Sequence, residues 1–146
     1  GVRLTVIGRR DRLDTDVVRA IQAAEKATSG CDGLHLRLAV DYSARDAIVA
    51  AAEALRGGAR VTRETLAHAM ARAIHDPAGA PDVDLLIRTG GEQRISDFLL
   101  WESAYAEMVF LHCMWPDFDA ADFETAIAEF GGRERRFGGL RAASAG

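Results

Sequence analysis

The stretch 84–110, DLLIRTGGEQRISDFLLWESAYAEMVF, holds the residues of this sequence that are best suited to chemistry. Arg88 and Arg94 flank the pair Gly90-Gly91, and Ser96 follows the second arginine by two positions. Glycines let a backbone turn sharply and approach a ligand without interference from a Cβ atom. Two guanidinium groups beside a hydroxyl are suited to a multiply charged, oxygen-rich anion such as a diphosphate.

The same stretch also permits a structural interpretation. The two arginines could form ordinary ion pairs with Glu92, Asp97 or Glu102. The spacing leaves both interpretations open, because the chain contains neither GxxxxGK[ST] nor GxGxxG, the familiar phosphate-binding loops.

The elements that would position these residues alternate along the chain. Period-two patterns and short apolar runs predict strands at 2–8, 34–40, 84–88 and 108–112. Helical periods with capping residues predict helices at 15–28, 44–58, 62–75, 96–106 and from 119 onward. This order indicates an α/β fold, with a mainly parallel sheet and helices on both faces. Ligands bind at the carboxyl ends of such strands, where Arg88 lies, and Ser96 would cap a helix whose free N–H groups favour an anion.

Composition narrows the class of protein. A length of 146 residues predicts a single domain over 1–146, and a net charge of −4 argues against nucleic acid as a partner. No apolar run reaches the roughly 18 residues of a membrane span. Cys31 and Cys113 show no disulfide or zinc spacing, and the four histidines show no ligand spacing. We therefore expect a cytoplasmic protein without a transmembrane segment.

The motif DLLIRTGGEQRISDFLLWESAYAE, followed by WPDF and RERRFGG, closely resembles the C-terminal part of the cis-prenyltransferases, the undecaprenyl diphosphate synthase (isoprenyl transferase) family. VRLTVIG, LRLAVDYSAR and DAIVAAAEAL resemble the segments that precede it, so the resemblance covers essentially the whole chain. It implies the family's α/β fold around a parallel sheet, and a homodimer. It also implies condensation of isopentenyl diphosphate with an allylic diphosphate, with Mg²⁺, to a Z-polyprenyl diphosphate of the undecaprenyl type.

The resemblance also implies residue roles. It assigns substrate binding to Arg88, Arg94, Ile95, Ser96, Arg136 and Gly138. Glu107 matches the glutamate that helps to hold Mg²⁺, a cation that prefers oxygen ligands. Arg136 and Gly138 match the Arg-x-Gly element that reaches the partner's diphosphate site across the family's dimer.

Part of the family's machinery is absent from this sequence. The DGNGRWA loop, whose aspartate helps to hold Mg²⁺ and the allylic diphosphate, has no counterpart, and neither have the SxENWxR-type segment and the helices of the product tunnel. The chain opens with GVRLTVIG, inside what the pattern predicts to be a core strand. We therefore expect a C-terminal portion without the N-terminal strands, with no catalytic residue of its own and no activity alone.

Two alternatives stay open: a non-catalytic partner subunit or pseudoenzyme that forms a heterodimer with a complete subunit, and a stand-alone diphosphate-binding module. The sequence gives neither the product chain length nor the allylic substrate, and it allows peripheral membrane contact only through the product. Several positions depart from the family pattern, among them Arg9, which replaces the aspartate usual after IG. Asp41, Ser43 and Ala44 stand in the NYGGR element, and Asp97 replaces the asparagine of RISNF. Asp97 adds a negative charge beside the expected diphosphate site, and Asp41, Ser43 and Ala44 leave the shape of their loop open.

Overall fold

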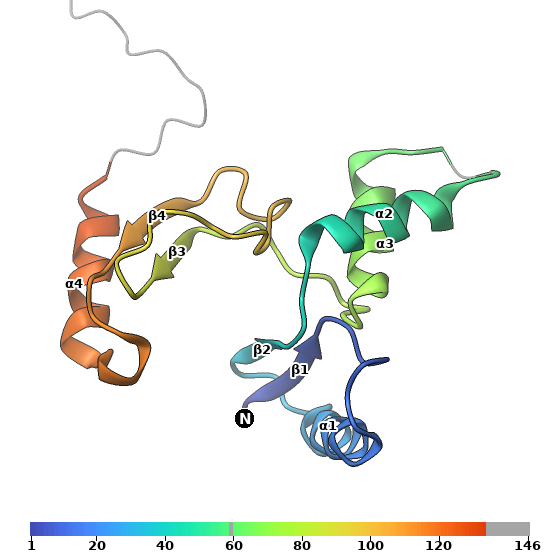
Figure 1. The fold of residues 1–146 in the computed structure, drawn as a ribbon, viewed down its shortest axis with the longest axis horizontal. Helices are drawn as coiled ribbons and strands as arrows, with labels where there is room; N and C mark the ends of the chain where they lie inside the picture. The colour runs from blue at the N-terminus through green and yellow to red at the C-terminus, as the bar shows by residue number, and fades with distance from the viewer. Residues whose placement is uncertain (59, 134–146) are drawn as a thin grey trace, which may run out of the picture. The chain divides into compact units, whose positions relative to one another are not determined.

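The structure, a computed structural model, describes two compact units (Figure 1). The described residues are 1–58 and 60–133. The first unit comprises Gly1–Pro81 and Ser96–Trp101, and the described part of the second comprises Asp82–Ile95 and residues 102–133. Each unit contains one pair of parallel strands together with helices, so the expected α/β class is confirmed. The single domain over 1–146 stays a prediction.

The first unit follows the predicted order of elements. Its elements are β1 (Arg3–Ile7), α1 (Thr15–Thr28), β2 (His35–Ala39), α2 (Ala44–Leu55) and α3 (Arg63–Ala73). β1 and β2 pair in parallel, with Arg3 opposite His35. Thr62 caps α3, and its side chain accepts a hydrogen bond from the Thr65 N–H. Local capping chemistry therefore sets this helix start, as the sequence predicts.

The core of this unit lies where β1 meets α2 and α3. Met70 and Ile7 are 1% and 3% exposed, and Ala47 and Ala51 are buried beside them. Alanines on α2 let the two helices approach closely, because no large side chain separates them. Leu99 packs against the same cluster from a segment much later in the chain. The helix pair thus anchors both the sheet and the stretch that follows Ser96.

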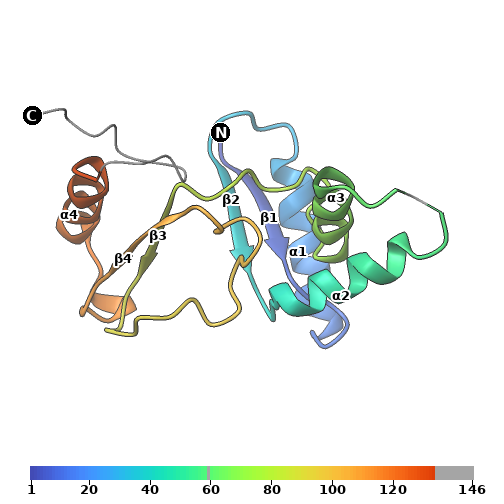
Figure 2. The same ribbon diagram turned by 90° about the horizontal axis from the view of Figure 1, so that it is seen from above.

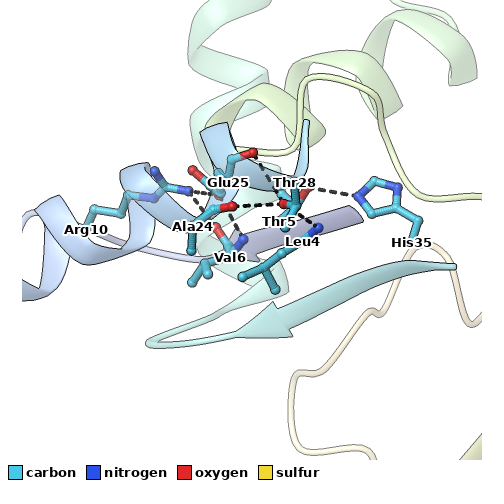
Figure 3. A network of polar contacts seen from close by, with 8 residues as sticks. All are labelled: Leu4, Thr5, Val6, Arg10, Ala24, Glu25, Thr28 and His35. Carbon is cyan, nitrogen blue, oxygen red and sulfur yellow. Dashed lines mark hydrogen bonds and ion pairs between the residues drawn. The ribbon is translucent and has the colours of Figure 1, made fainter. Parts of the chain in front are cut away.

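The outer edge of β1 is closed by side chains of α1 (Figure 3). Alternate residues of a parallel strand turn their N–H groups away from the paired strand, and in β1 these are Leu4 and Val6. The Leu4 N–H donates to Thr28 Oγ1 at 3.1 Å, and the Val6 N–H donates to Glu25 Oε1 at 2.9 Å. Arg10 donates to the Val6 carbonyl at 2.8 Å and to Glu25 at 2.6 Å. These contacts satisfy an edge that would otherwise pair with another strand.

The second unit is built on β3 (Leu85–Arg88), β4 (Glu107–Phe110) and α4 (Ala120–Gly131), with a 3₁₀ turn at Trp115–Asp117. β3 and β4 pair in parallel, and α4 lies beside β4 (Figure 2). Asp119 caps α4 as predicted, accepting hydrogen bonds from the backbone of the first turn. None of the described helices is both long and apolar enough to cross a membrane.

The predicted helix at 96–106 is wrong. The segment forms successive turns, and Ser96, Asp97 and Leu99 have φ values of 48°, 65° and 46°. A right-handed helix requires φ near about −60°, so these residues cannot belong to one. Ser96 therefore caps no helix, and the helix N-terminus expected to bind an anion there does not form.

We predict that Glu25→Gln lowers the free energy of unfolding by about 1–2 kcal/mol near neutral pH, because it removes the charge that pairs with Arg10. Partial burial raises the pKa of Glu25, but hydrogen bonds from Arg10 and the Val6 N–H outweigh it and leave that pKa below its ordinary value of 4.5. The stabilisation is therefore present above this ordinary value and is lost as the pH falls through the folded-state pKa.

Urea unfolding between about pH 3 and pH 7 tests this linkage, since the difference between Glu25→Gln and the unsubstituted protein should shrink in acid. Asp16→Asn is the control, because Asp16 lies on the same helix in an exposed pair with Arg19. That variant should change stability little at any pH. A difference for Glu25→Gln that stays constant with pH would contradict the assignment.

Candidate functional site

A glycine turn follows Arg88 at the carboxyl end of β3. Gly90 and Gly91 have φ values of 88° and 73°, which side chains with a Cβ rarely adopt. The Gly90 N–H donates to the Cys113 carbonyl at 2.8 Å, and the Gly91 N–H donates to the Leu111 carbonyl at 2.9 Å. The sharp turn expected from the sequence is present, and these backbone contacts fix it beside the end of β4.

This turn brings the two arginines of the motif together. The Arg88 guanidinium donates a hydrogen bond to the backbone carbonyl of Arg94. The Arg94 side chain is 63% exposed and pairs with Glu92. One of the ion pairs of the structural interpretation therefore exists, and an incoming anion would have to compete with Glu92 for Arg94.

The remaining substrate-binding predictions fall in three places. Ile95 is half-buried at the end of a segment of the second unit. Ser96 is exposed and belongs to the first unit. Arg136 and Gly138 lie outside the described residues. The structure thus brings Arg88 and Arg94 into contact, and all six substrate-binding assignments stay predictions.

Glu107 and Arg88 leave the strand pair of the second unit on opposite faces. Glu107 is opposite Leu85 in the register, and Arg88 lies three positions further along β3. Successive side chains of a strand alternate between faces, so an odd separation places the two side chains on different sides. Val109, which is 1% exposed, shares the face of Glu107. The expected metal ligand and the expected diphosphate ligand are therefore separated within one chain.

The Glu107 carboxylate is paired with Arg133. One guanidinium nitrogen of Arg133 donates to Glu107 Oε2 at 3.0 Å and to the Met108 carbonyl at 2.9 Å. The other terminal nitrogen pairs with Glu129 of α4. Hydrogen bonds to Glu107 and then to Glu129 raise the pKa of Arg133 above its ordinary value. Arg133 thus neutralises the one carboxylate that the resemblance assigns to a metal.

The donor set fits a metal only in part. Within residues 1–58 and 60–133 no three side chains of histidine, cysteine, aspartate or glutamate are grouped to hold a cation. Mg²⁺ in phosphate chemistry is commonly bound through one or two carboxylates, with substrate oxygens and water completing its shell. Glu107 can supply one such oxygen ligand if its carboxylate is released by Arg133.

The positions that depart from the family pattern have defined contacts in the first unit. Asp41 accepts from Arg12 Nε at 2.7 Å and adopts a left-handed φ of 50°. Ser43 caps α2, accepting from the Asp46 N–H, and Ala44 is fully buried. Ser43 donates to an Asp97 oxygen at 2.6 Å across 54 residues of sequence. That contact was missed from the sequence, where nothing at such a separation indicates it.

A hollow of about 410 Å³ opens at the carboxyl ends of β1 and β2, where such sheets bind ligands. Its lining includes the charged residues Arg9, Asp41 and Asp46 and the apolar residue Ile74. Arg9 pairs with Asp11 at 2.6 Å, and Asp41 pairs with Arg12. Two of the charged side chains at this hollow, Arg9 and Asp41, are therefore already paired.

Comparison with known families shows one match over nearly the whole chain. The family model described as putative undecaprenyl diphosphate synthase matches residues 1–138. Isoprenyl transferase 1 of Bradyrhizobium diazoefficiens is 58% identical over 97% of this chain and 56% of its own length. The isoprenyl transferase of Rhodopirellula baltica is 45% identical over 95% of this chain and 58% of its length. The chain thus spans little more than half the length of these relatives.

Solved structures give the same result. A probable undecaprenyl diphosphate synthase from Campylobacter jejuni is 38% identical with a TM-score of 0.80, over 94% of this chain and 63% of its own. The lavandulyl diphosphate synthase of Lavandula x intermedia, solved in complex with dimethylallyl diphosphate, is 34% identical with a TM-score of 0.83. The match covers 94% of this chain and 60% of the lavandulyl diphosphate synthase chain.

The Arg133–Glu107 pair predicts a specific response to metal. Arg133→Gln should strengthen binding of Mn²⁺, used as a paramagnetic probe with inorganic diphosphate, by roughly two- to tenfold, because the ion no longer competes with the guanidinium. Electron paramagnetic resonance titration measures the free ion. Arg19→Gln removes an exposed arginine and serves as the control.

In the double variant Glu107→Gln with Arg133→Gln the gain should disappear. Equal Mn²⁺ affinities for Arg133→Gln and the unsubstituted protein would exclude Glu107 as a ligand restrained by Arg133.

Proposed function

Because the chain belongs to the undecaprenyl diphosphate synthase family of isoprenyl transferases, we propose that it binds isopentenyl diphosphate for a cis-prenyl transfer reaction. The observation that supports this most directly is the contact between Arg88 and the backbone of Arg94 at the glycine turn. In it the Arg88 guanidinium meets the backbone carbonyl of Arg94, and the two permanently charged side chains are proposed to bind the same diphosphate. Each can donate two hydrogen bonds to phosphate oxygens.

Exposure and charge agree with this proposal. The Arg94 side chain is 63% exposed, and its partner Glu92 is 44% exposed, so the pair between them is an exposed one of small net stability. A diphosphate carries more charge than one carboxylate and offers more acceptor oxygens. It should therefore displace Glu92 at little cost, and Ser96 would add a hydroxyl donor as a third contact.

In the proposed reaction, an allylic diphosphate loses diphosphate, the double bond of isopentenyl diphosphate attacks the resulting carbon, and a proton leaves to form the new double bond. The residues described here bind and orient the nucleophile. Mg²⁺ would neutralise developing diphosphate charge when bound, with Glu107 as one of its ligands.

Assembly is part of the same proposal. Glu107 and Arg88 lie on opposite faces of the strand pair, so one chain does not present both to a single diphosphate. A dimer in which each site takes residues from two chains would resolve this, and Arg136 and Gly138 are the residues proposed to reach across it.

The lack of disulfide spacing, with Cys31 and Cys113 both free thiols, supports a cytoplasmic location.

The relative affinities for inorganic diphosphate and isopentenyl diphosphate distinguish the proposed function from that of a diphosphate-binding module without prenyl transfer. Such a module would bind inorganic diphosphate as well as isopentenyl diphosphate. The proposed function requires the isopentenyl group to add affinity, because its carbon chain must be oriented toward the electrophile.

We predict that Arg88→Ala and Arg94→Ala each weaken isopentenyl diphosphate binding by roughly ten- to a hundredfold, since each removes a charge-assisted contact. Glu92→Gln should act in the opposite direction and strengthen binding by a few-fold, because it removes the competing carboxylate. Isothermal titration measures all three.

Arg56→Ala is the matched control, because Arg56 is 72% exposed and pairs with Glu53 in the way that Arg94 pairs with Glu92. It should leave the affinity unchanged. If Arg88→Ala and Arg94→Ala bind isopentenyl diphosphate as the unsubstituted protein does, the proposed site is wrong.

A further inference from the structure

The backbone around Ser96 has an uncommon conformation. Ser96, Asp97 and Leu99 all have positive φ, at 48°, 65° and 46°. Residues with a Cβ atom adopt this region at a cost, and they remain there only where their surroundings hold them. Three such residues within four positions therefore need identifiable anchors.

Asp97 supplies the first anchor, at the N-terminal turn of α2. Its Oδ2 accepts from the Ser43 hydroxyl at 2.6 Å, and its Oδ1 accepts from the Arg45 N–H at 3.0 Å. The Asp97 backbone carbonyl accepts from the Ala44 N–H at 3.2 Å. Three donors from successive residues thus bind one residue. The carboxylate charge lies where the helix dipole is positive, which strengthens the contact.

Aromatic and aliphatic contacts supply the second anchor. Leu99 and Trp101 pack against the core cluster formed by β1, α2 and α3. The Phe98 ring meets Tyr42 edge-to-face, with ring centroids 5.6 Å apart. Tyr42 directly precedes Ser43, so the polar and aromatic anchors meet at the same strand-to-helix connection. The stretch from Asp97 to Trp101 is held along its whole length.

We propose that Asp97 is a positioning residue for the diphosphate site: by binding the N-terminus of α2, it fixes the left-handed backbone that presents the Ser96 hydroxyl to the substrate. This inference rests on the proposed function, because it requires that Ser96 contact the diphosphate. It also explains how an acidic residue can adjoin such a site. The Asp97 charge is directed at the helix N-terminus and its N–H donors, which offsets its repulsion of a neighbouring anion.

If Asp97 were only an extra cap of α2, its substitution would have a different effect on ligand affinity. A cap affects the free energy of unfolding and leaves ligand affinity unchanged. A positioning residue affects both, and a substitution that preserves the hydrogen bonds restores the affinity. Asparagine can preserve them, since its Oδ1 can accept from Arg45 and its amide can donate to the Ser43 oxygen.

The experiment is a titration of isopentenyl diphosphate against the purified protein, with urea unfolding of every variant. Asp97→Ala should weaken binding by roughly ten- to a hundredfold, as a displaced substrate contact does. Asp97→Asn should restore the affinity to within about threefold of the unsubstituted protein. Ser43→Ala removes a single hydrogen bond, so it should weaken binding less, and it covers the case that Asp97→Ala does not fold.

Thr62→Ala is the matched control. Thr62 caps α3 in the same unit, accepting from the Thr65 N–H at 3.2 Å, so its loss removes a helix cap far in sequence from Ser96. It should reduce stability and leave the affinity unchanged.

Three results overturn the inference. If Asp97→Ala and Ser43→Ala bind isopentenyl diphosphate normally while Arg94→Ala does not, the proposed function stands and the positioning role is wrong. If Thr62→Ala weakens binding as much as Asp97→Ala, the effect is one of stability alone. Normal binding by Arg88→Ala and Arg94→Ala would instead reject the proposed function, and the positioning role with it.

Discussion

A left-handed stretch of backbone, held by one carboxylate at a helix N-terminus, is the constraint on which the candidate site depends. Ser96, Asp97 and Leu99 cannot relax into a helix while Asp97 binds the first turn of α2 and Leu99 packs into the core. The core must form before this conformation is stable, because the helix pair supplies both anchors. Fold and site are thus linked through the same few contacts.

The ten residues from Ile87 to Ser96 are held in two different ways. The part up to Arg94 is fixed by backbone hydrogen bonds of the glycine turn and by the contact of Arg88 with the Arg94 carbonyl. Asp97, which follows Ser96, is bound to the N-terminal turn of α2. Exposed charge therefore precedes Ile95 in the sequence, and a partly buried anchor follows it.

Local signals made most of the fold predictable from the sequence. Thr62 and Asp119 cap helices through contacts within three residues, and Gly90 and Gly91 mark a turn by their lack of a Cβ. The helix expected at 96–106 failed because its apolar residues are spaced as in an amphipathic helix although they anchor successive turns. Contacts across long separations, such as Asp97 with Ser43 and Arg133 with Glu107, leave no such mark.

The closed edge of β1 limits where another strand could join the sheet of the first unit. The side chains of Thr28 and Glu25 accept hydrogen bonds from the N–H groups that β1 turns outward. An additional strand at this edge would have to break both hydrogen bonds before it could form its own. On β2 the N–H groups that turn outward are those of His35, Arg37 and Ala39, because the backbone of Leu34 and Val40 bonds to β1. By accepting these hydrogen bonds, α1 disfavours the addition of another strand at the β1 edge of the sheet.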